Sequence, residues 1–143
     1  MAIKYLADES VFLLETKNTC YMIQIYKNRF LYHLYYGSNT GKIPTYEARY
    51  LSFSPYFEQF GLSYSPDTAL CEFSGFDSGD FRTSTLRVKN RFGNSSTRYE
   101  YRYYKIFDGR KELPNFLPYG KADANTQTLM IVLEDTAAEC LLY

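Results

Sequence analysis

Two alternating stretches joined by a short polar turn constrain the fold of this chain more than any other feature of its sequence. Thr19–Tyr26 and residues 30–36 both alternate with a period of two, which predicts strands. Between them, Lys27-Asn28-Arg29 is typical of a tight turn, because asparagine tolerates positive φ. In the first stretch, one predicted face carries Tyr21, Ile23 and Ile25. In the second stretch, one face carries Phe30, Tyr32, Leu34 and Tyr36, and the other carries Leu31, His33 and Tyr35.

Shorter strand signals separated by turn signals fill most of the remaining chain. We expect strands at Val11–Glu15 and at residues 83–89, 96–107, 126–133 and 139–143, with turns at residues 90–94 and at Asp108-Gly109. In residues 96–107 the alternation predicts Tyr99, Tyr101 and Tyr103 on one side, and Arg98, Glu100, Arg102 and Tyr104 on the other. Residues 45–51 form the one weak helical signal, and residues 113–120 read as irregular. At least seven short strands without βαβ alternation favour an all-β, antiparallel sandwich.

The charge balance and the aromatic content narrow the function. The 143 residues include 16 basic and 16 acidic side chains, so no basic field is available for a nucleic-acid backbone. The chain contains sixteen tyrosines and eleven phenylalanines, residue types that favour strands. Tyrosine is also typical of partly hydrated surfaces such as sugar sites and subunit interfaces. Met1 opens a polar segment and no long apolar run follows. We therefore expect a cytoplasmic protein that has neither a nucleic-acid nor a membrane partner.

Metal, cofactor and nucleophile chemistry find little support in the sequence. Cys20, Cys71 and Cys140 are an odd number and widely spaced, which argues against a disulfide framework and a zinc site. His33 is the single histidine and stands mid-strand, so we interpret it as a packed or interface residue. The cysteines and the histidine thus predict neither a catalytic group nor a metal site, and we expect no cofactor in this chain.

Residues 65–82, SPDTALCEFSGFDSGDFR, form a polar and glycine-punctuated stretch between strand-like segments. Its carboxylates either shape turns, pair as acid and base, or bind calcium, although Asp77-Ser78-Gly79-Asp80 does not match an EF-hand loop. We expect a surface loop that its own charges order, with Asp80 and Arg82 pointing to the same side of an extended segment. From the residues alone, the chain is an aromatic-rich binding or accessory domain.

Five motifs carry a resemblance to a known family. Residues 16–37, TKNTCYMIQIYKNRFLYHLYYG, resemble the opening hairpin of the family 36 glycoside hydrolases, the bacterial α-galactosidases. Four further motifs are similar to other elements of that family. In chain order they are Phe53-Ser54-Pro55; Ser65-Pro66-Asp67 with Glu72-Phe73 and Gly79-Asp80-Phe81-Arg82; residues 103–111; and residues 128–135. Together these motifs cover nearly the whole chain.

The resemblance implies a domain organisation. The family has an N-terminal β-supersandwich of the galactose mutarotase type, then a (β/α)8 barrel with two catalytic aspartates, then a small C-terminal β domain. Residues 1–143 resemble the first part of the first domain. The resemblance therefore implies a non-catalytic sandwich truncated at its C-terminal end. Residues 139–143, ECLLY, lead to the same expectation, because they begin a strand where the chain ends.

The resemblance also implies a substrate class, an assembly and one site residue. In tetrameric members, an aspartate three positions before the phenylalanine of the Phe-Ser-Pro motif reaches into a neighbour's active site. The matching residue here is Tyr50, a departure from the family, and a tyrosine can still stack on or hydrogen-bond to a sugar. We expect a homo-oligomer and α-galactoside oligosaccharides as partners of the full-length enzyme. The alternative is a stand-alone sandwich that binds carbohydrate or protein, and the DNA downstream of the last codon distinguishes the two.

Overall fold

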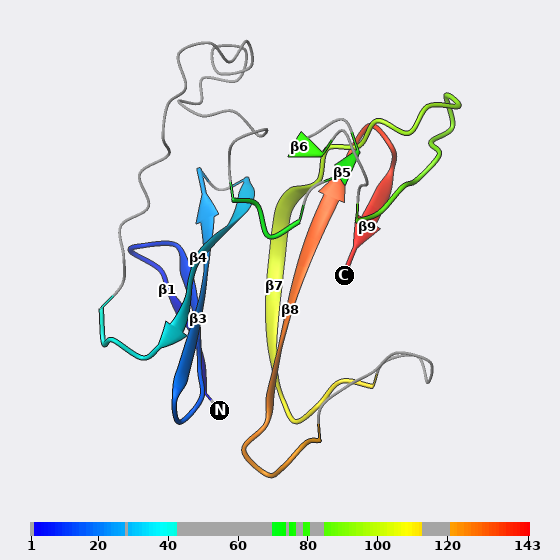
Figure 1. Ribbon diagram of the computed structural model, residues 1–143. Helices are drawn as coiled ribbons and strands as arrows, with labels where there is room; N and C mark the ends of the chain where they lie inside the picture. The colour runs from blue at the N-terminus through cyan, green and yellow to red at the C-terminus, as the bar shows by residue number, and fades with distance from the viewer. Residues whose placement is uncertain are drawn as a thin grey trace, which may run out of the picture.

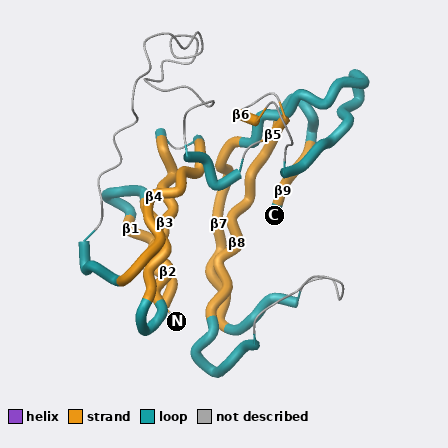
Figure 2. The backbone as a smooth tube through the Cα atoms, in the orientation of Figure 1, coloured by secondary structure: helices purple, strands orange, loops and turns teal. Residues whose placement is uncertain are grey.

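The computed structural model describes residues 2–27, 29–42, 70–73, 75–76, 79–80, 85–112 and 121–143. In this part of the chain the regular structure consists of strands, and no helix occurs (Figure 2). The nine strands are β1 Ala2–Leu6, β2 Val11–Glu15, β3 Thr19–Tyr26, β4 Phe30–Ser38, β5 Gly75–Phe76, β6 Gly79–Asp80, β7 Glu100–Asp108, β8 Gln127–Asp135 and β9 Cys140–Leu142.

Two antiparallel sheets account for all strands except β5 and β6, which pair with each other in parallel. The amino-terminal sheet has the order β1-β2-β3-β4, and the carboxy-terminal sheet has the order β7-β8-β9. Figure 1 shows these sheets as two layers that lie beside each other, and side chains from both layers share one core. The predicted all-β, antiparallel sandwich is thus confirmed.

The hairpin predicted over residues 19–36 is confirmed, and β4 extends two residues further, to Ser38. Lys27 takes the left-handed conformation at the turn, with φ 53, while Asn28 lies outside the described residues. Residue 10 also takes a positive φ, of 55, at the turn between β1 and β2. The β1 strand was missed, although Ile3 and Tyr5 alternate with Lys4 in the manner of a half-buried strand.

A bulge in β4 changes the predicted faces of that strand. Met22 pairs with Tyr35 and Ile23 with His33, so Leu34 is the extra residue between two register positions. An extra residue re-aims the side chains that follow it. Tyr36 therefore lies on the same face as His33, and both rings contact Tyr21. The strict alternation predicted through residue 36 is wrong beyond this bulge.

A second bulge has the same effect in β7. Tyr101 pairs with Leu133 and Tyr103 with Val132, which makes Arg102 the extra residue. As a result Tyr104, predicted on the face opposite to Tyr101, packs with it against the core. The strand also begins at Glu100 instead of residue 96.

The connections around β7 differ from the prediction. Asp108-Gly109 was expected to close a two-residue hairpin, but β8 begins only at Gln127, and the Gly109 amide donates to the Thr126 carbonyl at 2.7 Å. Gly109 nevertheless has the expected positive φ, of 81. Of the strand predicted over residues 83–89, the described residues 85–89 contribute one isolated bridge, between Gly75 and Leu86. A turn is present at residues 90–94, where the Asn90 amide donates to the Asn94 carbonyl, but the expected hairpin is not, because residues 87–90 and 94–99 form no strand.

The core lies between the two sheets. Its buried residues are Phe12, Ile23, Ile25 and Leu31 from the amino-terminal sheet, and Tyr99 and Leu133 from the carboxy-terminal region. Because both sheets present aromatic and branched side chains to this space, they bury each other's apolar faces. The opposite face of the amino-terminal sheet carries a second buried cluster of Val11, Cys20 and Met22.

Candidate functional site

The site residue predicted from the resemblance, Tyr50, lies outside the described residues. So do the predicted helical turn at residues 45–51, the irregular stretch at residues 113–120 and most of the polar stretch 65–82, including Arg82. The backbone of Asp80 is described as part of β6, but its side chain is not.

One polar pocket lies where the β3–β4 turn meets the carboxy-terminal sheet. Its volume is about 420 Å³, and Arg29, Arg98, Glu100, Tyr101, Glu134 and Thr136 are among its lining residues. A backbone hydrogen bond anchors the turn at this place, because the Tyr101 amide donates to the Arg29 carbonyl at 2.6 Å. The pocket thus forms at a junction between the two sheets.

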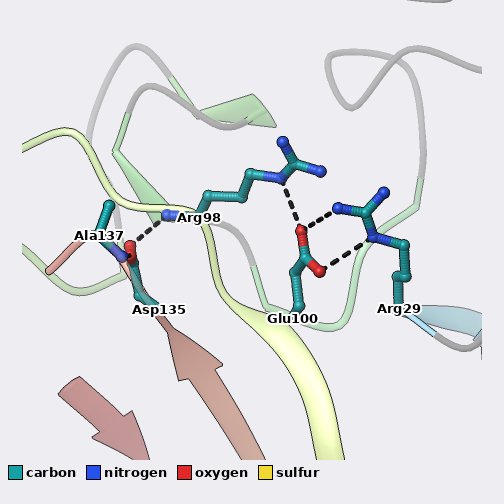
Figure 3. Close-up of polar contacts among 5 residues, drawn as sticks. All are labelled: Arg29, Arg98, Glu100, Asp135 and Ala137. Atoms are coloured by element: carbon teal, nitrogen blue, oxygen red, sulfur yellow. Dashed lines mark hydrogen bonds and ion pairs between the residues drawn. The ribbon is translucent and has the colours of Figure 1, made fainter. Parts of the chain in front are cut away.

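Glu100 is held by two arginines from different parts of the chain (Figure 3). The Arg29 guanidinium donates to both carboxylate oxygens, with a distance of 2.9 Å from Nε to Oε2. Nε of Arg98 lies 2.9 Å from Oε1 of the same carboxylate. A bidentate guanidinium–carboxylate pair has a defined geometry, which sets the position of the hairpin turn on β7. The three side chains are about one-third exposed, so solvent weakens the electrostatic contribution.

Asp135 forms the buried floor beside this cluster, with only 2% of its surface exposed. Its Oδ2 accepts the Arg98 amide at 2.5 Å, and its Oδ1 accepts the amides of Ala137 and Ala138 at 2.9 Å each. Figure 3 shows the Arg98 and Ala137 contacts. One carboxylate therefore fixes both the entry into β7 and the turn between β8 and β9.

The charges of this pocket hold segments together. Arg29, Arg98 and the nearby Arg102 face the carboxylates of Glu100, Glu134 and Asp135, and Arg102 pairs with Glu134 at 3.3 Å. Positive and negative charges thus balance. A glycosidase needs one carboxyl group to deliver a proton and a second to attack or to activate water. The carboxylates of this pocket accept hydrogen bonds from guanidinium and amide groups, which stabilise the structure. The pocket therefore connects segments of the two sheets.

His33 belongs to a second polar cluster, which sequence reasoning missed. Its Nδ1 lies 2.9 Å from Oε1 of Glu72 and 3.2 Å from the Tyr21 hydroxyl, and that hydroxyl lies 2.6 Å from both Glu72 oxygens. Burial, followed by the hydrogen bond and charge of Glu72, raises the pKa of the Tyr21 hydroxyl. The prediction of a packed histidine captured its partial burial but not its carboxylate partner.

Backbone pairing brings Glu72 to His33. The His33 amide donates to the Leu70 carbonyl at 2.7 Å, and the Glu72 amide donates to the Leu31 carbonyl at 3.0 Å. Residues 70–72 thereby extend the amino-terminal sheet beyond β4. No signal in the local sequence could have shown this pairing, because Glu72 lies 39 residues from His33.

The described residues contain no group of three or more histidine, cysteine, aspartate or glutamate side chains that could hold a metal ion. Within the same part of the chain, no helix is long and apolar enough to cross a membrane. Two facing antiparallel sheets that share one core, connected by the ion pair between Arg29 and Glu100, define a β-sandwich domain.

The comparisons with known proteins identify the family of this sandwich. The family model of the glycosyl hydrolase family 36 N-terminal domain matches residues 29–142, and the chain belongs to this family. It is 33% identical to the bifunctional α-galactosidase/sucrose kinase AgaSK of Mediterraneibacter gnavus, and the match covers 100% of this chain and 16% of that protein. It is 32% identical to the α-galactosidase Mel36A of Lactobacillus acidophilus, over 99% of this chain and 20% of Mel36A.

Solved structures give the same result. The galactosidase domain of AgaSK matches with a TM-score of 0.79 and 35% identity, over 96% of this chain and 20% of that one. A variant of the α-galactosidase AgaA from Geobacillus stearothermophilus, solved in complex with raffinose, matches with a TM-score of 0.74 and 27% identity over 87% of this chain and 18% of AgaA. The chain thus spans about a fifth or less of the relatives that it matches.

Proposed function

We propose that this chain is the non-catalytic, amino-terminal β-sandwich of an α-galactosidase, which hydrolyses terminal α-D-galactosyl residues of oligosaccharides. The proposal rests on the match to AgaSK, which covers 100% of this chain and 16% of AgaSK. Solved complexes of AgaA variants with raffinose and stachyose favour α-galactosyl oligosaccharides as the substrate class. Residues 1–143 form one structural part of such an enzyme, and we place it in the cytoplasm.

The proposed role is to support the enzyme. Glycoside hydrolysis requires two carboxyl groups that flank the scissile bond, separated by about 5–9.5 Å depending on the mechanism. Among the described residues near the pocket, the carboxylates of Glu100, Glu134 and Asp135 already accept hydrogen bonds or pair with arginine. The family resemblance assigns the catalytic aspartates to the barrel. The sandwich then serves to stabilise the barrel and its assembly.

We further propose that the sandwich contributes to oligomer contacts and to the rim of a neighbouring active site. Exposed large apolar side chains supply contact surface, among them Leu70, Leu141 and Tyr143. A formal net charge of zero adds little repulsion between copies. At the rim, Tyr50 takes the position of the family's aspartate and would contact the sugar through its ring or hydroxyl.

Purified chain incubated with nitrophenyl α-galactoside tests the non-catalytic assignment. We expect no release of nitrophenol above that of the buffer, because both catalytic carboxylates are supplied by the barrel. Glu134→Gln and Glu72→Gln are the informative variants if turnover appears. Turnover that follows the protein through purification and disappears in either variant would show that this chain carries its own catalytic group.

The DNA downstream of the last codon separates the proposed role from a stand-alone binding module. An open reading frame that continues into a barrel with two catalytic aspartates agrees with the proposal. A stop codon with no barrel gene nearby favours the stand-alone module.

A further inference from the structure

The bulge in β4 places two aromatic side chains with different roles on one face. Tyr36 and His33 both contact the ring of Tyr21, with centroid distances of 5.8 and 5.2 Å. Without the extra residue Leu34, the alternation of the strand would turn Tyr36 to the opposite face. Bulges occur frequently beside functional sites, where they re-aim a side chain.

Glu72 fixes the orientation and tautomer of the imidazole. An ionised carboxylate only accepts hydrogen bonds, so Nδ1 of His33, at 2.9 Å, carries the proton that faces it. In the neutral ring, Nε2 then offers a lone pair. Among the described residues none bonds to Nε2, and 37% of the His33 side chain is exposed. Within the described part of the chain, the ring thus keeps one hydrogen-bond acceptor without a partner.

Tyr36 provides an open aromatic surface on the same face of the sheet as His33. It is 66% exposed, although its ring packs edge-on against Tyr21, with an interplanar angle of 61°. The packing limits the motion of the ring while its outer surface stays accessible. An aromatic surface with a polar group beside it suits a ligand that has both an apolar and a hydroxylated side.

We propose that Tyr36 and His33, with Glu72 behind them, form a subsite for one pyranose ring of an oligosaccharide. The C–H face of the sugar stacks on Tyr36, and one hydroxyl donates to Nε2 of His33. Within the described structure no lysine or arginine contacts this cluster, and Glu72 adds a negative charge, so anionic ligands are disfavoured. The subsite goes beyond the proposed function. Only the choice of an α-galactoside as the first probe rests on that function.

The single histidine allows a direct test on the full chain by nitrogen NMR of its imidazole. We expect raffinose to shift the His33 Nε2 resonance in a saturable manner in the millimolar range. Tyr36→Ala should abolish the shift, and Tyr36→Phe should preserve it because the ring remains. Phe92→Ala is the matched control, since Phe92 is exposed to a similar extent, 68%, but lies outside the cluster. This control should bind like the unaltered chain.

The panel includes maltotriose, which has no galactosyl unit, and tetramethylammonium, a cation that aromatic rings beside a carboxylate could also attract. Binding of maltotriose but not raffinose supports the saccharide subsite and removes its link to α-galactosides. Absence of a saturable shift with any saccharide overturns the subsite, while the proposed function is tested separately by enzyme activity. Undiminished binding by Tyr36→Ala, or a response to tetramethylammonium alone, also overturns it.

Discussion

Asp135 shows how a single buried carboxylate can fix two segments. It accepts backbone amides from Arg98, Ala137 and Ala138, and its side chain has almost no contact with solvent. An unsatisfied buried donor costs about 1–3 kcal/mol. Removing this acceptor therefore affects the start of β7 and the β8–β9 turn together.

We expect Asp135→Ala to lower the free energy of unfolding by about 2–4 kcal/mol, as measured by urea denaturation. Asp135→Asn should lose less, because the amide oxygen still accepts a hydrogen bond. Asp123→Ala is the control: Asp123 also accepts bonds from a turn, through Asn125 and Thr126, but is exposed. A loss below about 0.5 kcal/mol for Asp135→Ala would show that water replaces the carboxylate.

Cys71 provides a pH-dependent prediction at the same scale. Burial raises the pKa of its thiol from an ordinary value of 9.0 to about 11. The folded state therefore keeps the proton to higher pH than the unfolded state. The stabilising contribution of the half-buried thiol is complete below pH 9, and it is lost as the pH rises toward 11.

Iodoacetamide labelling of the native chain at pH 8, read by peptide mass spectrometry, tests this prediction. The thiolate is the reactive form, so Cys71 should be modified much more slowly than in urea-unfolded protein. The protection should diminish as the labelling pH approaches 11. Equal labelling rates in the native and the unfolded chain at pH 8 would contradict the partial burial of this thiol.

The strands of this protein were predictable where the signal was local. Thr19–Tyr26 was located with its bounds, because its period of two requires no knowledge of its neighbours. The faces of β4 and β7 were predictable only up to Leu34 and Arg102, since a bulge depends on how the partner strand is paired. At Asp108-Gly109 the residues indicated a positive φ correctly, but they did not reveal the length of the connection.

Gly109 gives a prediction for the end of β7. Its φ of +81 lies in a region that is strained for residues with a Cβ, whereas a Cβ added at this position would meet no other atom within 4 Å. Gly109→Val should therefore destabilise through backbone strain alone, by about 1–2 kcal/mol in thermal or urea unfolding. Gly109→Asn should cost less, because asparagine tolerates this conformation. Equal stability of the valine variant and the unaltered chain would show that the connection relaxes.

At the scale of the whole molecule, the polar clusters depend on contacts that are distant in sequence. Arg29 and Glu100 are 71 residues apart, and the Ile3 amide donates to the Gln127 side chain across 124 residues. Composition and alternation predicted a sandwich, but they do not specify which polar residues meet when they are distant in the sequence. For this reason the pocket at Glu100 and the cluster at His33 emerged only from the structure.

The central claim, that this chain works as the amino-terminal sandwich of an α-galactosidase, can be tested by domain replacement. The matching stretch of Mel36A would be exchanged for this chain, and hydrolysis of raffinose would be measured as kcat/KM. A Val132→Asp variant of the chimera is the control, because Val132 is fully buried. Tyr50→Asp, which introduces the family's aspartate, tests the proposed rim contact and should lower KM.

We expect the chimera to fold and to retain activity within about tenfold of Mel36A, a difference of about 1.4 kcal/mol in transition-state stabilisation. The Val132→Asp chimera should be poorly folded and inactive. A chimera that yields a correctly folded barrel without hydrolytic activity, in both the Tyr50 and the Tyr50→Asp forms, would contradict the account.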